Sequence, residues 1–309
     1  MLSFSSSRRV LAAAVATGVV ALAAQNVSAV QIYAFDNLGT TNVGSIGDRF
    51  IRFDTANPAG TVVTLGTSGV ANRGMSGLDF AGNGNLYSVS GFNSDSTAFA
   101  GSQLFSVNKN TGASTLIGNC NLPTGYAATD LSWNPVSQQM FMIAANGTTN
   151  PNRLYTVNLG TGAANLIGDI TGIAGGLDVG LASNSAGVNY LHDIVSDRMY
   201  SLAGTAATGL PSPVGIDCNF SQGMVINWQQ GNGWYLGAIT SSLISEVVQI
   251  NNATGAGTVL PNGVWPTHSN GLPEYETGDL AIAPIPEPAS LALAGGLLAG
   301  FALRRRRSR

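Results

Sequence analysis

One unit of sequence recurs five times in this chain, and this repetition restricts the possible folds more than any other feature. Each copy begins with a short segment that alternates apolar and polar residues; the five segments are residues 50–54, 104–108, 154–158, 199–202 and 247–251. Their first residues lie 54, 50, 45 and 48 positions apart. A turn sequence such as Asn110-Thr111-Gly112-Ala113 and a second apolar run follow each segment. This pattern is typical of β-hairpins.

Two further strands are predicted in front of each hairpin. The first would be residues 77–80, 130–133, 178–181, 223–228 and 279–283, and the second 85–89, 139–143, 189–194 and 233–239. Strand 279–283 has no successor, whereas the first hairpin is preceded only by strand 31–36. Pairing of these two strands, with Leu280 near Tyr33, would complete a fifth sheet. The sequence therefore predicts an all-β fold, a five-bladed β-propeller with overlapped closure of its two ends. A β-sandwich or β-solenoid is the alternative, but neither accounts for this period.

The charged residues are few and unevenly distributed. Only 9% of the 309 residues are charged and 40 are glycine, which excludes coiled coils and charged helical bundles. Seven of the 13 basic residues lie near the two ends, so residues 30–283 hold six basic and 15 acidic residues. The net charge of this body is near −9. We therefore expect no nucleic-acid partner, because neutralising phosphates needs Lys and Arg.

Residues 1–29 have the features of a signal peptide. Arg8 and Arg9 precede an apolar run at 10–24, and Val27-Ser28-Ala29 has the small residues of a cleavage site. A helix of 15 residues would rise about 22 Å, less than the roughly 30 Å of a membrane core. A cleaved signal helix is therefore preferred over a membrane span, and the chain is expected to be exported.

A second targeting segment is predicted at residues 284–309, after the propeller domain at 30–283. It has a Pro-Glu-Pro triplet, an apolar stretch at 289–303 and an arginine cluster; the motif residues are Pro286, Glu287, Pro288, Arg304, Arg305, Arg306 and Arg307. This order resembles the PEP-CTERM sorting signal of Gram-negative bacteria. The resemblance implies a short transmembrane helix that holds the precursor in the inner membrane with its arginines in the cytoplasm. It also implies an exosortase-type enzyme that cuts near the motif. A plain C-terminal membrane anchor is the alternative.

Three aspartates stand at corresponding places in the predicted inner strands. They are Asp130, Asp178 and Asp279, while Gly77 and Gly223 take this place in the other two blades. In a propeller these positions would surround one mouth of the central channel. Carboxylates gathered there would suit Ca²⁺, which prefers oxygen ligands. The other interpretation is that each carboxylate accepts backbone N–H hydrogen bonds, and the sequence leaves both open.

Cys120 and Cys218 follow the fourth strands of two blades that are not neighbours. An exported chain meets an oxidising compartment, so a disulfide between them is a hypothesis. Two separate buried thiols are the alternative, since the Cα atoms of a disulfide lie within about 7 Å. His192 and His268 show no spacing typical of hydrolytic sites and are expected to be structural or exposed.

Trp265 is the best candidate for a ligand platform. It is predicted to lie in a loop, where its ring could stack on a sugar, whereas the other tryptophans fall in predicted strands.

The predicted function is binding. The chain would be an exosortase-sorted protein of the cell surface or extracellular matrix, with a propeller that binds an unidentified ligand, polysaccharide among the candidates. Repeats such as residues 82–87 resemble those of bacterial propellers, which include binding scaffolds and lactonase-like enzymes, so the fold does not choose between them. The competing hypothesis is a metal-assisted hydrolase or lactonase-like enzyme that uses the channel aspartates. The export machinery and the inner membrane would be transient partners.

Overall fold

The computed structural model describes residues 30–36, 47–71, 73–91, 101–147, 150–218, 223–229, 231, 233–267, 274–275 and 277–284. The predicted signal peptide and the Pro-Glu-Pro and arginine residues lie outside these described residues, and so does His268.

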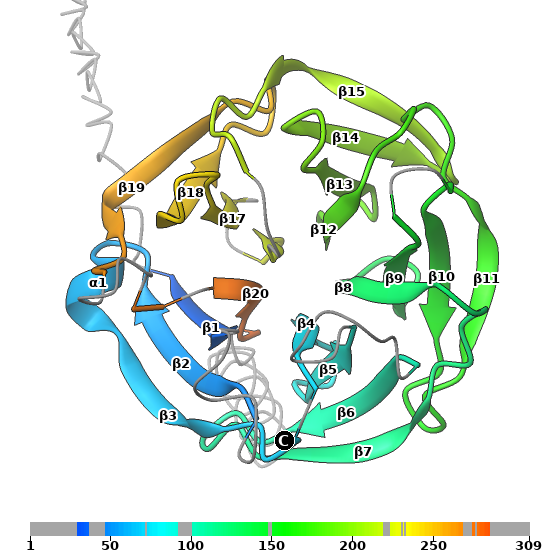
Figure 1. Ribbon diagram of the computed structural model, residues 1–309, viewed down its shortest axis with the longest axis horizontal. Coiled ribbons are helices and arrows are strands. Elements are labelled where there is room, and N and C mark those ends of the chain that lie inside the picture. Colours follow the sequence, from blue (N-terminus) through cyan, green and yellow to red (C-terminus); the bar gives the residue numbers. More distant parts are fainter. Residues whose placement is uncertain are drawn as a thin grey trace, which may run out of the picture.

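Within the described residues, twenty strands form five antiparallel sheets of four strands, arranged as blades around a central axis (Figure 1). Blade 1 consists of β20 (Thr277–Ile282), β1 (Gln31–Asp36), β2 (Arg49–Asp54) and β3 (Val63–Thr67). Blade 2 consists of β4 (Met75–Phe80), β5 (Leu86–Ser90), β6 (Gln103–Val107) and β7 (Ser114–Asn119). Blade 3 consists of β8 (Ala127–Asn134), β9 (Gln139–Ala145), β10 (Arg153–Val157) and β11 (Ala164–Asp169). Blade 4 consists of β12 (Asp178–Ser183), β13 (Asn189–Asp193), β14 (Arg198–Ala203) and β15 (Ala206–Pro213). Blade 5 consists of β16 (Met224–Asn227), β17 (Gly233–Ile239), β18 (Ser245–Ile250) and β19 (Gly257–Val264).

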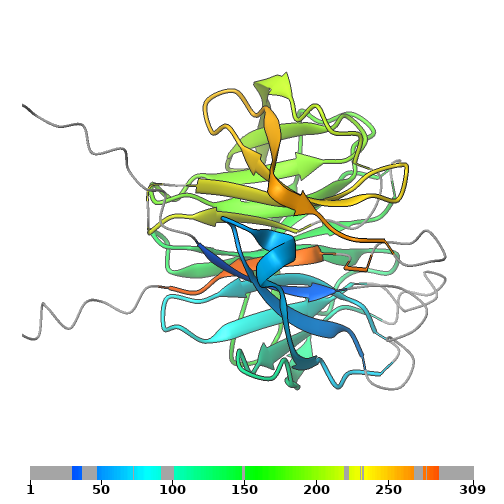
Figure 2. The ribbon, with the colours of Figure 1, turned by 90° about the vertical axis from the view of Figure 1, so that its left-hand side faces the viewer.

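The two ends of the described chain meet in blade 1, which confirms the predicted closure. Strand β20 pairs with β1 in antiparallel register, with Leu280 opposite Ala34 and Ala281 opposite Tyr33. The inner strand of this blade therefore comes from the C-terminal part of the propeller and its other three strands from the N-terminal part. Because the ring is closed, blade 1 has four strands like the other blades, and its inner strand β20 lies beside the central axis. In the side view of Figure 2, β1 begins and β20 ends on the same side of the ring.

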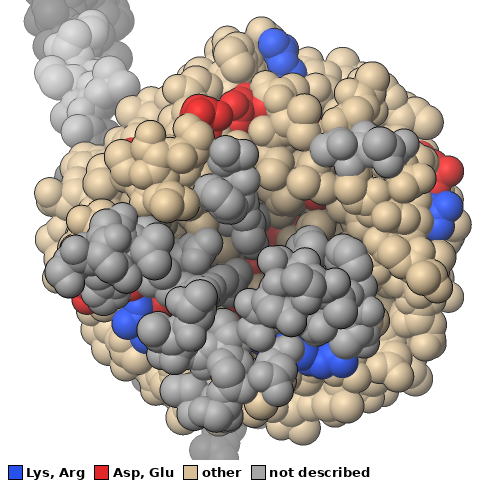
Figure 3. Space-filling view, viewed as in Figure 1, with Lys and Arg blue, Asp and Glu red and all other residues tan. Residues whose placement is uncertain are grey.

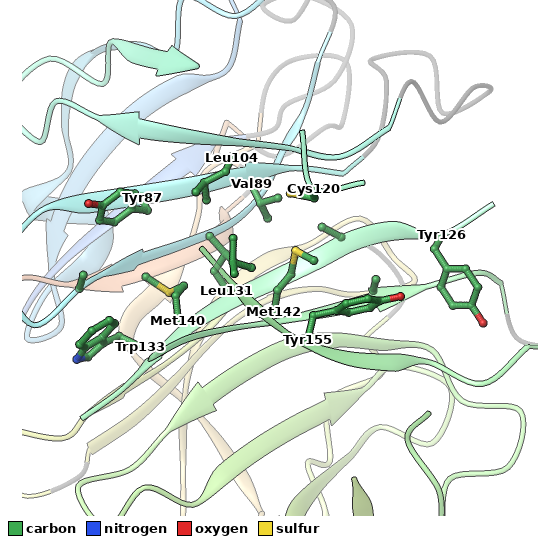
Figure 4. Close-up of a cluster of buried hydrophobic side chains, with 14 residues drawn as sticks. Tyr87, Val89, Leu104, Cys120, Tyr126, Leu131, Trp133, Met140, Met142 and Tyr155 are labelled. Carbon is green, nitrogen blue, oxygen red and sulfur yellow. The ribbon is translucent and has the colours of Figure 1, made fainter. Parts of the chain in front are cut away.

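Five hydrophobic clusters hold the ring together, one between each pair of neighbouring blades. Figure 4 shows the cluster between blades 2 and 3, where Tyr87 and Leu104 face Leu131, Met140 and Tyr155. The cluster between blades 5 and 1 joins Val225 and Tyr235 to Ile32 and Leu280. The inner and middle strands are buried because both of their faces contact a neighbouring blade. The outermost strands, such as β7 and β11, expose much of their length.

One short helix, α1 (Pro58–Thr61), interrupts the described strands between β2 and β3. Asn57 caps it by accepting a hydrogen bond from the backbone N–H of Gly60 at 3.2 Å. Among the described residues no helix is long and apolar enough to cross a membrane.

Glycine allows the inner strands to approach one another closely. A Cβ atom on Gly77 would lie 2.6 Å from the backbone nitrogen of Leu131 in the next blade, and one on Gly223 would lie 2.4 Å from Cα of Asp279. Both distances are too short for a real carbon atom. The two glycines that stand among the channel aspartates are therefore required by packing.

Candidate functional site

The two faces of the ring carry different features. The inner strands β4, β8 and β16 end at Phe80, Asn134 and Asn227 on one side, which we call the pocket face. They begin on the opposite side, which we call the aspartate face. The predicted site residues belong to the aspartate face, whereas the pockets described next open on the other.

Three surface pockets repeat on the pocket face, in blades 2, 3 and 5. Their volumes are about 330, 340 and 390 Å³ respectively. Each is lined by the start of the second strand, the end of the third strand and the turn that follows it. In blade 3, for example, these parts are represented by Gln139, Val157 and Asn158. The same local structure is therefore used three times around the ring.

A polar pair at one register position forms the centre of this repeat. Thr156 lies opposite Asn165 in blade 3, and Gln249 lies opposite Thr258 in blade 5, each pair joining the third and fourth strands. Ser106 lies opposite Thr115 at the same position in blade 2. All of these except Thr115 line their pockets.

The chemistry of the pockets is polar and nearly uncharged. Their lining is rich in amide and hydroxyl side chains, and Lys109 in blade 2 is the one charged side chain in the three linings. Tyr87 and Trp133 are the aromatic residues in the linings of the pockets of blades 2 and 3 respectively. Apart from Lys109, such a surface offers hydrogen-bond donors and acceptors without a charge to attract an ion.

The other two blades differ at this position. In blade 4 the pair is Ser201 and Thr208, which keeps the polar character, whereas in blade 1 it is Arg52 and Val63. These residues are hard to recognise from the sequence, because each looks like ordinary exposed polar surface. Alignment of the five third strands would have shown the repeated polar position.

Asp130 is buried and already bound by backbone groups. Its Oδ1 accepts a hydrogen bond from the N–H of Leu131 at 2.7 Å, and its Oδ2 accepts one from Leu181 in blade 4 at 2.7 Å. Burial raises the pKa of Asp130, and the charge of Asp279 adds to this rise. The structure thus gives Asp130 the structural role that was one of the two interpretations.

Asp178 does not occupy the same register position as Asp130. In blade 3, Asp130 of the inner strand pairs with Ile143 of the second strand, which in turn pairs with Leu154 of the third. In blade 4 the residues at these three positions are Gly180, His192 and Met199. Asp178 pairs instead with Asp193 and accepts a hydrogen bond from Asn152 at 2.9 Å. Burial raises the pKa of Asp178 to about 7, with the charge of Asp193 adding to the rise. The expected alignment was two residues off here: the bulge between Asp178 and Gly180 corresponds to the bulge between Ala128 and Asp130, so Gly180 is the counterpart of Asp130.

Asp279 does occupy the register position of Asp130 in its own blade. It pairs with Phe35 of the second strand, which pairs with Phe50 of the third. It is fully buried, and within the described residues neither carboxylate oxygen has a hydrogen-bond partner. Burial raises the pKa of Asp279 well above its usual value, and the nearby Asp48 raises it further. Burial thus favours the neutral form of this carboxyl group.

The three aspartates predicted as calcium ligands are thus not brought together as a set. Among the described residues, the three ligand-type side chains whose donor atoms lie within 4.8 Å of one another are His192, Asp197 and Cys218. In the space-filling view of Figure 3, acidic atoms are visible inside the central hollow and basic side chains are few. The structure gives the Ca²⁺ prediction no coordination geometry.

Two further expectations are corrected. Trp265 is not an exposed platform: it is 1% exposed and packs edge-on against Phe53, with ring centroids 5.1 Å apart, and beside Tyr275. Strand β19 carries Trp265 back onto blade 1, which covers it. Cys120 and Cys218 are not joined, because Cys120 lies in the cluster between blades 2 and 3 and Cys218 in that between blades 4 and 5.

The C-terminal targeting segment is similar to a known sorting motif. Residues 284–307 match the model of the PEP-CTERM protein-sorting motif. The chain carries a PEP-CTERM sorting signal. This motif implies export and a membrane-anchored precursor that an exosortase processes. The PEP-CTERM segment directly follows β20, so the sorted part of the chain is the five-bladed propeller.

Solved structures with a similar course of the chain have low sequence identity to this PEP-CTERM protein. A chain of a nidogen/laminin complex is 11% identical, with a TM-score of 0.49, over 82% of this chain and 98% of that chain. A putative 6-phosphogluconolactonase from Bacteroides uniformis is 13% identical, with a TM-score of 0.43, over 84% and 98%. A periplasmic gluconolactonase from Pseudomonas aeruginosa is 16% identical, with a TM-score of 0.43, over 76% and 68%. No curated protein matches the chain.

Proposed function

We propose that this PEP-CTERM propeller is a binding protein of the cell surface or extracellular matrix and that its ligand is an uncharged polysaccharide. The observation that carries the proposal is the repeat of one polar pocket on blades 2, 3 and 5. A polymer of repeating sugar units can occupy several such pockets at once. Weak binding in each pocket then adds to a high overall affinity.

The charge of the protein supports an uncharged ligand. The body has a net charge near −9, which disfavours anionic polymers, and the pocket linings contain no Asp or Glu that would select a cation. Amide and hydroxyl groups instead match the hydroxyl groups of neutral sugars. The PEP-CTERM signal supports a location outside the cytoplasm, where such polymers are found.

An enzyme is the less favoured alternative. A metal-assisted hydrolase would need Asp130, Asp178 and Asp279 around an ion with an open ligand position. The carboxylate of Asp130 instead accepts a hydrogen bond from the backbone N–H of Leu181. Asp178 lies two residues away from the register position that Asp130 and Asp279 share. This arrangement supports a scaffold.

The test is a glycan array probed with the purified protein, followed by affinity measurements on the polysaccharide it retains. A double variant, Gln249→Ala with Thr258→Val, removes the polar pair of one pocket. We expect it to bind the polymer about tenfold or more weakly, because one of several linked contacts is lost. The same variant should bind a single short oligosaccharide at the remaining pockets with unchanged affinity per site.

A matched control changes another polar pair between the third and fourth strands. Gln103 and Asn119 form a side-chain hydrogen bond of 2.9 Å on the aspartate face of blade 2. Replacing both by Ala should leave polymer binding unchanged. The proposal is wrong if the array retains no neutral glycan, or if the pocket variant binds the polymer as well as this control.

A further inference from the structure

We infer that His192, Asp197 and Cys218 form a binding site for a transition-metal ion, with Zn²⁺ as the ion whose ligand preferences they match best. An imidazole nitrogen, a carboxylate oxygen and a sulfur atom lie within 4.8 Å of one another there. His192 and Cys218 are buried and Asp197 is partly exposed. The site is independent of the pockets proposed for polysaccharide, because it lies in the part of the ring near the aspartate face.

Three separate segments bring these side chains together. His192 comes from β13, Asp197 from the turn between β13 and β14, and Cys218 from the connection between blades 4 and 5. The backbone N–H of Cys218 donates a hydrogen bond to Oδ1 of Asp197 at 2.9 Å. Cys218 also forms an isolated bridge with Thr240, at the end of β17. The connection is therefore fixed to both blades at the residue that supplies the sulfur.

The backbone around the site makes room for the imidazole. Gly180 is the partner of His192 on β12, and a Cβ atom there would lie 3.2 Å from Cβ of His192 and 3.0 Å from Cβ of Met224. A side chain at residue 180 would thus crowd the histidine. Asp197 adopts a positive φ of 46°, which is uncommon for a residue other than glycine. Its backbone carbonyl accepts a hydrogen bond from Val214 at 2.7 Å, which holds the turn in this conformation.

The set of donor atoms selects the class of ion. Thiolate and imidazole ligands favour Zn²⁺ and related transition metals over Ca²⁺ and Mg²⁺, which prefer oxygen. Around a tetrahedral Zn²⁺ the ligand atoms are roughly 3.3–3.8 Å apart, as follows from metal–ligand bonds of about 2.0–2.3 Å. The observed spacing needs only side-chain adjustments to reach this geometry. Three protein ligands leave a fourth position for water or another group.

Local charge also favours a cation. The carboxylates of Asp193 and Asp217 lie close enough to Asp197 to interact with it electrostatically. A divalent cation would offset the repulsion among these carboxylates. Asp193 is itself held by the backbone N–H groups of Leu177 and Ser196, so it supplies charge beside the site without being a ligand.

The chain offers a matched control for the sulfur ligand. Cys120 is also buried, but among the described residues no pair of ligand-type side chains gathers around it as His192 and Asp197 do around Cys218. A single thiol supplies one of the several ligands that a protein-bound transition metal needs. The variants Cys120→Ser and Cys218→Ser therefore compare the same substitution inside and outside the proposed site.

The experiment is titration of the purified, metal-free protein with Co²⁺, which reports thiolate ligation through a charge-transfer band in the near ultraviolet, followed by displacement with Zn²⁺. We expect the band in the unaltered protein and in Cys120→Ser, and its loss on addition of Zn²⁺. In Cys218→Ser the band should be absent. The inference is overturned if the unaltered protein shows no band, or if Cys218→Ser retains it.

A second variant covers the case in which Cys218→Ser does not fold. Asp197 is partly exposed, and Asp197→Asn keeps an oxygen that can accept the hydrogen bond from Cys218. We expect Asp197→Asn to keep the cobalt–thiolate band but to bind Co²⁺ at least tenfold more weakly. Affinity equal to that of the unaltered protein would overturn the role of Asp197 as a ligand.

Discussion

The carboxylate of Asp130, in the inner strand of blade 3, accepts a hydrogen bond from the backbone N–H of Leu181 in blade 4 at 2.7 Å. Asp79 makes a contact of the same kind between blades 2 and 3, two residues further along the inner strands, where its Oδ2 accepts from the N–H of Trp133 at 2.7 Å. Each carboxylate thus fastens its own blade to the next. Such bonds are strong because the surroundings are buried, but they place acidic groups where ionisation is costly.

The first prediction concerns the pH dependence of stability. Burial raises the pKa of Asp79 to about 7, so between about pH 4 and pH 7 the native state holds a proton that the unfolded chain releases. The contribution of Asp79 is therefore complete below pH 4 and is lost as the pH rises through 7. A shift of this size corresponds to at most about 4 kcal/mol.

Urea unfolding at a series of pH values measures this effect. The free energy of unfolding of the unaltered protein should fall as the pH rises from 4.5 to 7.5, and Asp79→Asn should fall less steeply. The variant should retain part of the slope, because the pKa values of Asp130, Asp178 and Asp279 are also raised. Identical slopes would contradict the role given to Asp79.

The second prediction tests the close approach of blades 5 and 1. A Cβ atom on Gly223 would lie 2.4 Å from Cα of Asp279, so Gly223→Ala must push two inner strands apart. We expect a loss of about 1–3 kcal/mol or more in the free energy of unfolding. Gly160→Ala is the control, since a Cβ atom there would be 3.4 Å from a single side-chain oxygen of Asn158. Equal stability of the two variants would argue against the close packing.

The third prediction concerns the boundary of the propeller. A chain that stops after Tyr275 lacks β20, and with it Leu280 and the partner strand of β1. Loss of the buried Leu280 side chain alone costs about 2–5 kcal/mol, so this chain should unfold at a much lower temperature or fail to fold. A chain that stops after Pro284 should melt like the full protein. Thermal unfolding followed by circular dichroism compares them, and equal melting of both would show that closure is dispensable.

The fourth prediction concerns sorting. Deletion of residues 286–309 removes the Pro-Glu-Pro triplet and the arginine cluster but leaves every described strand intact. The protein should still be exported and folded, but it should no longer be held as a membrane precursor and should accumulate in a different fraction. Fractionation of cells and medium with an antibody against the propeller measures this. An unchanged distribution would mean that the motif does not direct this protein.

The architecture could be predicted from the sequence because the repeat is strong. The alternation in each hairpin and the unpaired strands at the two ends were enough to place Leu280 beside the strand of Tyr33, as observed. The register of single residues was less predictable. The inner strands of blades 2, 3 and 4 pair with a bulge, and Asp178 lies two residues before the counterpart of Asp130.

Functional residues were harder to predict because their roles depend on contacts between blades. Trp265 lies beyond the regular repeat, and only packing against Phe53 and Tyr275 buries it. From the sequence, Cys218 is a candidate disulfide partner of Cys120. The sequence does not show the connection that places Cys218 near His192 and Asp197. Convergence of three segments is a property of the folded ring.

The closure of blade 1 also determines the direction from which the protein is tethered. Strand β20 ends at Ile282, on the same side of the ring as the ends of the other inner strands and thus as the three pockets. In a precursor anchored through the segment beyond Pro284, the chain would therefore leave the propeller on the pocket face. Cleavage by the exosortase would free this face from the anchor, so processing of the tail would also control when the proposed polysaccharide pockets become accessible.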